Sequence, residues 1–239
     1  MSSPCAQSAT DLADLLSLSS PPLAISFTQS AAVGTPRFSG AVPTPAADGR
    51  TGKVPAGCVF WMHADKATFS TNADDHANCS VGSVTHGFRK IEEVASKSDV
   101  AALLESGWVT MDAVPKIPVV KERPTFVTYG PLKDAAEIPD VVFLRLNAKQ
   151  AMVMSDAIPD IHFEGKPQCH IIPMAKEDKQ VAISVGCMLS RVRTGMPNTE
   201  MTCAIPGGRL DEVLTRLRAT VKADKAVAAY AATDAKRFQ

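Results

Sequence analysis

The sequence has no excess of either charge, because its 25 basic side chains balance 25 acidic ones among 239 residues. A nucleic-acid-binding protein needs a basic surplus to contact phosphates, so we expect no nucleic-acid partner. No apolar run reaches the roughly 18 residues that a membrane span requires. Residues 1–10 also lack the basic and apolar regions of a signal peptide. We therefore expect a cytoplasmic protein with no membrane partner.

The sequence also lacks several nucleotide-binding, catalytic and redox motifs. It has no G-x-G-x-x-G, Walker A, G-x-S-x-G or C-x-x-C sequence. Six cysteines would suit three disulfides by count, but in a reducing compartment they are expected to be buried thiols, metal ligands or reactive groups. Apolar residues make up 45% of the chain, which is enough for a folded core.

Alternating strand and helix patterns predict one α/β or α+β domain over residues 1–239. Residues 29–57 contain several prolines and glycines and are expected to form a long loop. The C-terminal segment has apolar residues at helical spacing, which predicts a long helix running into a helical tail over 222–239. The other expected helices cover residues 8–18, 58–66, 98–104 and 149–158, and the expected strands cover 23–27, 67–71, 125–130, 140–146, 182–187 and 200–206. Residues 159–180 are expected to be a loop.

The segment 72–88 is polar and rich in reactive side chains. If it were helical, one face would carry four of them: His76, Cys79, Ser83 and His86. A thiolate and two imidazoles on one face could hold zinc or iron. An Asp75–His76–Cys79 relay with Cys79 as nucleophile is a second interpretation. An ordinary helix N-terminus with a buried Cys79 is a third, and the pattern alone favours it.

Cys187 ends a predicted strand and precedes a new element. A cysteine at a helix N-terminus has a lowered pKa, so Cys187 is a candidate thiolate ligand or nucleophile. Arg191 and Arg193 could bind an anion nearby, and Glu200 could be a buried carboxylate facing Arg191. A buried strand-end cysteine beside two solvated arginines and an exposed glutamate explains the sequence equally well.

Cys58 and Cys169 are each more typical of a core than of a ligand when taken alone. With Cys79 and Cys187 they make a set of four. Cys58 and Cys79 are 21 residues apart, Cys169 and Cys187 are 18 residues apart, and this spacing supports a cluster only weakly. Cys203 alternates with apolar residues in a strand and is expected in the core. The Gly207-Gly208 turn is more typical of a strand–helix connection than of an anion site.

The C-terminal third contains Gly186-Cys187, Arg191, Thr194-Gly195, Glu200-Met201 and Ile205-Pro206-Gly207. In these features it resembles a bacterial and archaeal family known as domain of unknown function 169. Earlier segments also match: 21–27, the region of Cys58, 74–82, 139–146 and a cysteine near position 169. The resemblance implies that Cys58, Cys79, Cys169 and Cys187 form a group. It implies no general activity. Some members carry a further cysteine where this chain has Ser190.

Together these features favour a metalloprotein. An iron–sulfur cluster or another transition metal would be held by Cys58, Cys79, Cys169 and Cys187, with His76 or His86 assisting, and would act on a small molecule with a redox partner protein. His76, Cys79, Cys187, Arg191 and Glu200 are the candidate catalytic residues. Two alternatives remain open: a metal-free enzyme with a cysteine nucleophile, and a non-catalytic accessory protein that binds a small ligand or a metal.

Overall fold

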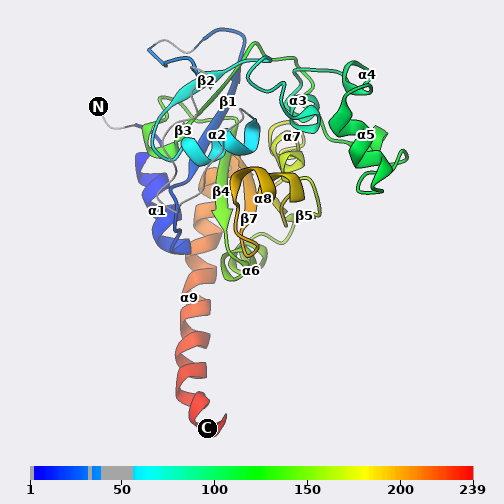
Figure 1. The fold of residues 1–239 in the computed structure, drawn as a ribbon. Coiled ribbons are helices and arrows are strands. Elements are labelled where there is room, and N and C mark those ends of the chain that lie inside the picture. The colour runs from blue at the N-terminus through cyan, green and yellow to red at the C-terminus, as the bar shows by residue number, and fades with distance from the viewer. Residues whose placement is uncertain (1–2, 32–33, 39–55, 239) are drawn as a thin grey trace.

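The protein folds around a seven-stranded sheet in the computed structural model, which describes residues 3–31, 34–38 and 56–238 (Figure 1). The strand order is β2-β3-β1-β4-β7-β6-β5. Every neighbouring pair is antiparallel except β5 and β6. The strands are β1 (Leu23–Thr28), β2 (Phe69–Thr71), β3 (Phe126–Pro131), β4 (Val141–Leu146), β5 (His162–Glu164), β6 (Ala182–Ser184) and β7 (Met201–Pro206).

Nine α-helices accompany the sheet within the described ranges, which confirms a mixed α/β fold with a long C-terminal helix. They are α1 (Ala6–Leu16), α2 (Gly57–His63), α3 (Ser80–Thr85), α4 (Ile91–Val94), α5 (Ser98–Glu105), α6 (Ala148–Ala157), α7 (Ile171–Glu177), α8 (Met188–Thr194) and α9 (Leu210–Asp234). Among these residues no helix is both long and apolar enough to cross a membrane.

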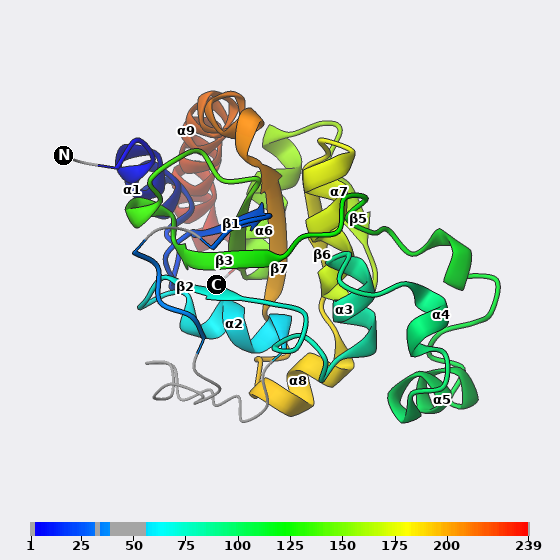
Figure 2. The same ribbon diagram turned by 90° about the horizontal axis from the view of Figure 1, so that it is seen from above.

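One face of the sheet is covered by α1, α6 and α9 (Figures 1 and 2). Val142 and Leu144 of β4 point to this side because side chains alternate along a strand. The predicted apolar stripe of α9 is buried against them, at Leu210, Val213, Leu214, Leu217 and Val221. Cys203 lies in this core, fully buried, as its alternation predicted.

The opposite face carries α2 and α7. Phe60 and Trp61 of α2 pack there against Tyr129 and Phe143 of the sheet. Arg145 alternates with Phe143 along β4, so it faces the same side, and its side chain is 8% exposed. This face therefore combines an aromatic core with a buried cation.

Two expected elements differ in the structure. The segment 72–88 is not one helix: turns over 73–78 precede the short α3, and only the second half is helical. Residues 159–180 are not simply a loop, since they contain β5, a 3-10 turn η3 (Gln168–His170) and α7. Residues 39–55 of the expected long loop lie outside the described residues. The helices α4 and α5 form a lobe beside the sheet (Figure 2).

Candidate thiol site

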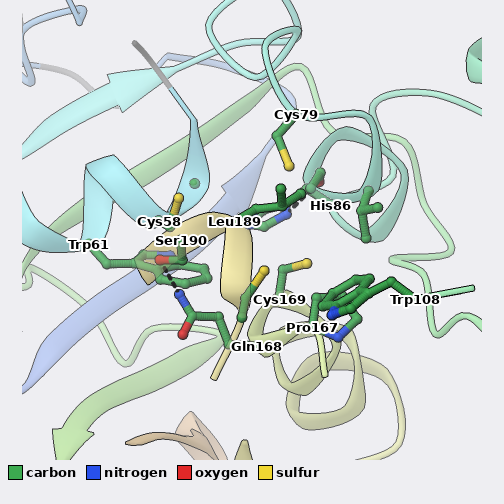
Figure 3. Close-up of a pocket in the computed structure, with 14 residues that line it drawn as sticks. Cys58, Trp61, Cys79, His86, Trp108, Pro167, Gln168, Cys169, Leu189 and Ser190 are labelled. Atoms are coloured by element: carbon green, nitrogen blue, oxygen red, sulfur yellow. Dashed lines mark hydrogen bonds between the residues drawn. The ribbon is translucent and has the colours of Figure 1, made fainter. Parts of the chain in front are cut away.

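Four cysteines from four separate elements line one small pocket, here called the thiol pocket. Cys58 lies in the first turn of α2, Cys79 precedes α3, Cys169 lies in η3, and Cys187 precedes α8. The pocket has a volume of about 30 Å³, which holds a water or two but no organic substrate. Figure 3 shows the sulfurs of Cys58, Cys79 and Cys169 around this space.

The Cys169 thiol is held neutral. Burial raises its pKa well above the ordinary value, and the nearby Cys79, Cys187 and Cys58 thiols raise it further. The other three sulfurs of the pocket are thus close enough to Cys169 to act on its charge. A cation in the pocket would reverse the effect, because a bound metal favours the thiolate form.

His86 adds a nitrogen donor to the wall of the thiol pocket. Its Nδ1 lies 2.8 Å from the carbonyl oxygen of Gly82, which can only accept a hydrogen bond. Nδ1 therefore carries the proton, and Nε2 keeps its lone pair. Nε2 is buried and has no hydrogen-bond partner among the described residues. Burial lowers the pKa of His86 to about 4, so the ring is neutral at pH 7.

His76 lies behind the pocket wall rather than in it. Its ring centroid is 4.9 Å from that of His86 and 4.8 Å from that of Phe88. Thr71 donates its hydroxyl hydrogen to Val127 O, so Nε2 of His76, 3.1 Å from the Thr71 hydroxyl oxygen, is the donor of that contact. Burial lowers the pKa of His76 well below its usual range.

The geometry does not assemble the Asp75–His76–Cys79 relay. The Asp75 carboxylate accepts from the Asn72 backbone N–H at 2.8 Å and pairs with Arg37 at 3.3 Å. His76 Nδ1 is buried without a hydrogen-bond partner in the described part of the chain. Asp75 thus fastens the turn before α3 and does not orient the imidazole.

Arg191 fastens the backbone around Cys187. Its guanidinium donates to the carbonyl oxygens of Val185 (2.7 Å), Glu200 (3.2 Å) and Pro197. Gly186 has a φ of +117°, and a methyl group there would lie 2.6 Å from Arg191 Nη2. The Gly-Cys sequence is therefore needed for the turn that presents Cys187, because glycine alone adopts this φ at little cost.

The Glu200 carboxylate faces Arg145, not Arg191. Glu200 Oε1 lies 3.3 Å from Arg145 Nε, and the two side chains are 15% and 8% exposed. Both residues line a second small pocket that shares Cys58 and Trp61 with the thiol pocket. A buried ion pair thus lies next to Cys58. Its cation was not predicted, because Arg145 lies within an otherwise apolar strand.

Other residues of the thiol pocket were also missed: Trp108, Pro167, Gln168 and Leu189. Gln168 donates through Nε2 to the Ser190 hydroxyl at 2.8 Å (Figure 3). Ser190, to which the family resemblance drew attention, also lines the pocket. The family resemblance was therefore the feature of the sequence that could have identified this part of the thiol-pocket wall.

All six cysteines are free thiols. In the part of the chain that the structure describes, no three His, Cys, Asp or Glu side chains stand at the distances of a single-ion site. Thiolates that hold a multinuclear cluster lie farther apart than the ligands of one ion, because the cluster itself occupies the space between them. The donor types, four sulfurs and one bare imidazole nitrogen, are those that iron–sulfur clusters and soft metals take.

The fold and site define a class: a three-layer α/β protein whose sheet carries a multi-cysteine pocket on one face. Residues 11–216 match the family described as uncharacterised ArCR, or domain of unknown function 169. The chain belongs to this family. No curated protein and no solved structure matches it.

Proposed function

We propose that this chain is a cytoplasmic metalloprotein that holds an iron–sulfur cluster, or another transition metal, in the thiol pocket. Cys58, Cys79, Cys169 and Cys187 would be the ligands. The observation that carries the proposal is their convergence: positions spread over 130 residues of sequence meet at one pocket of about 30 Å³. Free cytoplasmic thiols, with no C-x-x-C motif to suggest disulfide exchange, suit metal ligation.

His86 supports the same proposal independently. A metal-binding histidine usually donates its second N–H to a carbonyl or carboxylate, which fixes the tautomer and points the other nitrogen at the metal. His86 has that arrangement through Gly82, with a buried Nε2 that lacks a partner among the described residues. It would be a fifth donor or a replacement for one thiolate.

The metal would supply electron transfer, or Lewis-acid activation of a bound small molecule. The chain's own residues would hold the four thiolates, exclude bulk water, and place the Arg145–Glu200 pair beside the site. The Arg145 guanidinium lines the same small pocket as Cys58, and a positive charge near a thiolate favours its charged form. A redox partner protein would be needed for the electron-transfer role.

The test is a metal and sulfide assay on protein purified without oxygen, with its visible spectrum. We expect stoichiometric metal, and loss of it when Cys58, Cys79, Cys169 or Cys187 is replaced by Ser. Cys5→Ala and Cys203→Ala are matched controls, because both thiols are buried in the other core and should leave the metal in place. Wild-type protein without iron, zinc or sulfide, or equal losses in the control variants, would refute the proposal.

A further inference from the structure

A much larger pocket, separate from the two described above and here called the apolar chamber, lies between α3 and the lobe of α4, α5 and residues 108–117. Its volume is about 520 Å³, within the range of sites that bind organic ligands. Most of its wall is aliphatic, with Ile91, Val94, Leu103 and Leu104 as examples. Such a wall favours an apolar occupant, because burying apolar surface away from water is stabilising.

The apolar chamber and the thiol pocket share a wall. Val81, Trp108 and Pro167 line both of them. The thiol pocket is too small for an organic molecule, whereas the chamber next to it is large enough for one. A molecule in the chamber would therefore lie within one side-chain layer of the cysteines.

Four of the chamber's wall residues are polar: Ser80, Thr110, Lys166 and His170. The Ser80 hydroxyl is already satisfied, since it donates to the Asp99 carboxylate at 2.7 Å. The Lys166 ammonium lies over the Trp108 ring, 4.5 Å from its centroid. His170 is different, because its Nε2 is buried without a hydrogen-bond partner among the described residues.

The tautomer of His170 follows from its other nitrogen. Nδ1 lies 3.1 Å from Glu164 Oε1, and a carboxylate only accepts, so Nδ1 carries the hydrogen. With the hydrogen on Nδ1, the neutral ring has only a lone pair at Nε2, so Nε2 is an acceptor. An unsatisfied buried acceptor is costly, and a hydroxyl or N–H group of a ligand would satisfy it.

We infer that the apolar chamber binds a small, mostly aliphatic molecule that carries one hydroxyl or N–H donor, with His170 as the hydrogen-bonding anchor held by Glu164. This inference names the substrate class of the thiol site, and to that extent it rests on the proposed function. Binding itself depends only on the chamber.

The experiment compares 1-decanol with 1-methoxydecane, which has the same chain without the donor, by calorimetry and thermal shift on the full chain. We expect decanol to bind about fivefold more tightly, the value of one neutral hydrogen bond. His170→Phe keeps the ring and should abolish this preference while both compounds still bind. His170→Gln supplies an acceptor again and should restore part of it.

Leu104→Trp and Ala113→Trp fill the chamber from half-buried positions and should each abolish binding of both compounds. Val227→Trp makes the same change on the exposed part of α9 and should bind normally. Failure of wild-type protein to bind either compound would overturn the inference. So would binding by both chamber-filling variants that is as tight as that of the wild type. Metal and sulfide assayed on the same samples distinguish the proposed metal site from the proposed ligand site. Protein that binds decanol but holds no metal refutes only the proposed function. Protein that holds metal but does not bind decanol refutes only the inference.

Discussion

The Arg191 guanidinium fills the space that a side chain at Gly186 would need. A methyl group on Gly186 would lie 2.6 Å from Nη2 and 3.1 Å from Cζ of Arg191. The same arginine donates to the carbonyl oxygen of Val185, just before the turn. The Arg191 side chain thus holds the turn between β6 and Cys187, and it fits there because residue 186 is a glycine.

Gly186→Ala should therefore destabilise the protein and weaken the thiol site. The positive φ and the displaced Arg191 together should cost about 2 kcal/mol, measured as a lower urea midpoint. Gly208→Ala is the matched control, because a methyl group there meets nothing within 4 Å. Equal stability of the two variants would show that Arg191 does not hold the turn.

His86→Phe should reduce metal affinity at least about tenfold, comparable to the loss of a supporting ligand contact. The phenyl ring keeps the packing against Phe27, whose ring centroid is 5.9 Å away, so the fold should persist in circular dichroism. His63→Phe, a buried histidine outside the wall of the thiol pocket, should retain full affinity. Unchanged metal binding by His86→Phe would remove this residue from the ligand set.

Glu200→Leu should destabilise the fold by about 2–3 kcal/mol, because it leaves the buried Arg145 guanidinium without its carboxylate. The double variant Arg145→Met with Glu200→Leu removes both charges and should recover most of that loss. Urea unfolding of the two single variants and the double variant measures the coupling. Simple additivity of the single losses would mean that the ion pair contributes no specific coupling.

The stability of the fold should fall in acid partly through His63. Burial, followed by the nearby Lys66 charge, lowers the pKa of His63 below the value of about 6.5 that it has in the unfolded chain. As the pH falls below about 6.5, the unfolded state takes up the proton first, so the free energy of unfolding decreases until the folded pKa is passed. Above this window His63 contributes nothing to the pH dependence.

His63→Phe removes this titration, so its unfolding free energy should decline less between pH 6.5 and 5 than that of the wild type. Urea unfolding at pH 8, where His63 is neutral in both states, gives the reference offset between the two proteins. An equally steep decline in the variant would assign the acid sensitivity to other groups.

A chain ending at Lys222 should unfold within about 1 kcal/mol of the full chain. Beyond Val221 helix α9 is mostly exposed, and the ion pair between Lys149 and Asp224, at 3.6 Å, is a surface contact that contributes little to stability. Leu214→Ala is the contrasting change, since it opens a cavity under the sheet and should cost about 2–5 kcal/mol. A large loss on truncation would mean that the exposed part of α9 is stabilised by an association.

The sequence predicts the elements whose signals are local. The stripe from Leu210 to Val221 marks α9, and Asn147 caps α6 by accepting from the Gln150 N–H at 3.0 Å. Helix α7 was missed, because residues 159–180 were expected to be a loop. Pro173 lies at the third position of the helix. Proline is tolerated there because a backbone N–H in the first turn has no hydrogen-bond partner within the helix.

The sequence predicted which cysteines form the thiol site but not how they are arranged. Family resemblance grouped Cys58, Cys79, Cys169 and Cys187, but their spacing carries no geometric signal, because each comes from a different element and tertiary packing alone unites them. The chamber and its His170–Glu164 pair were not predicted, since β5 is only three residues long and pairs with β6 at the sheet edge. The rings of His76 and His86 pack together, but His76 lies in the turns before α3 and not on a shared helix face, and it is not at the pocket wall.

Two consecutive residues of η3 line different pockets. Cys169 lines the thiol pocket and His170 lines the apolar chamber, so a single peptide unit forms part of both. Because that unit is shared, a backbone change that repositions one side chain also moves the other. A backbone shift at η3 would therefore change both the ligand preference of the apolar chamber and the sulfur arrangement of the thiol pocket.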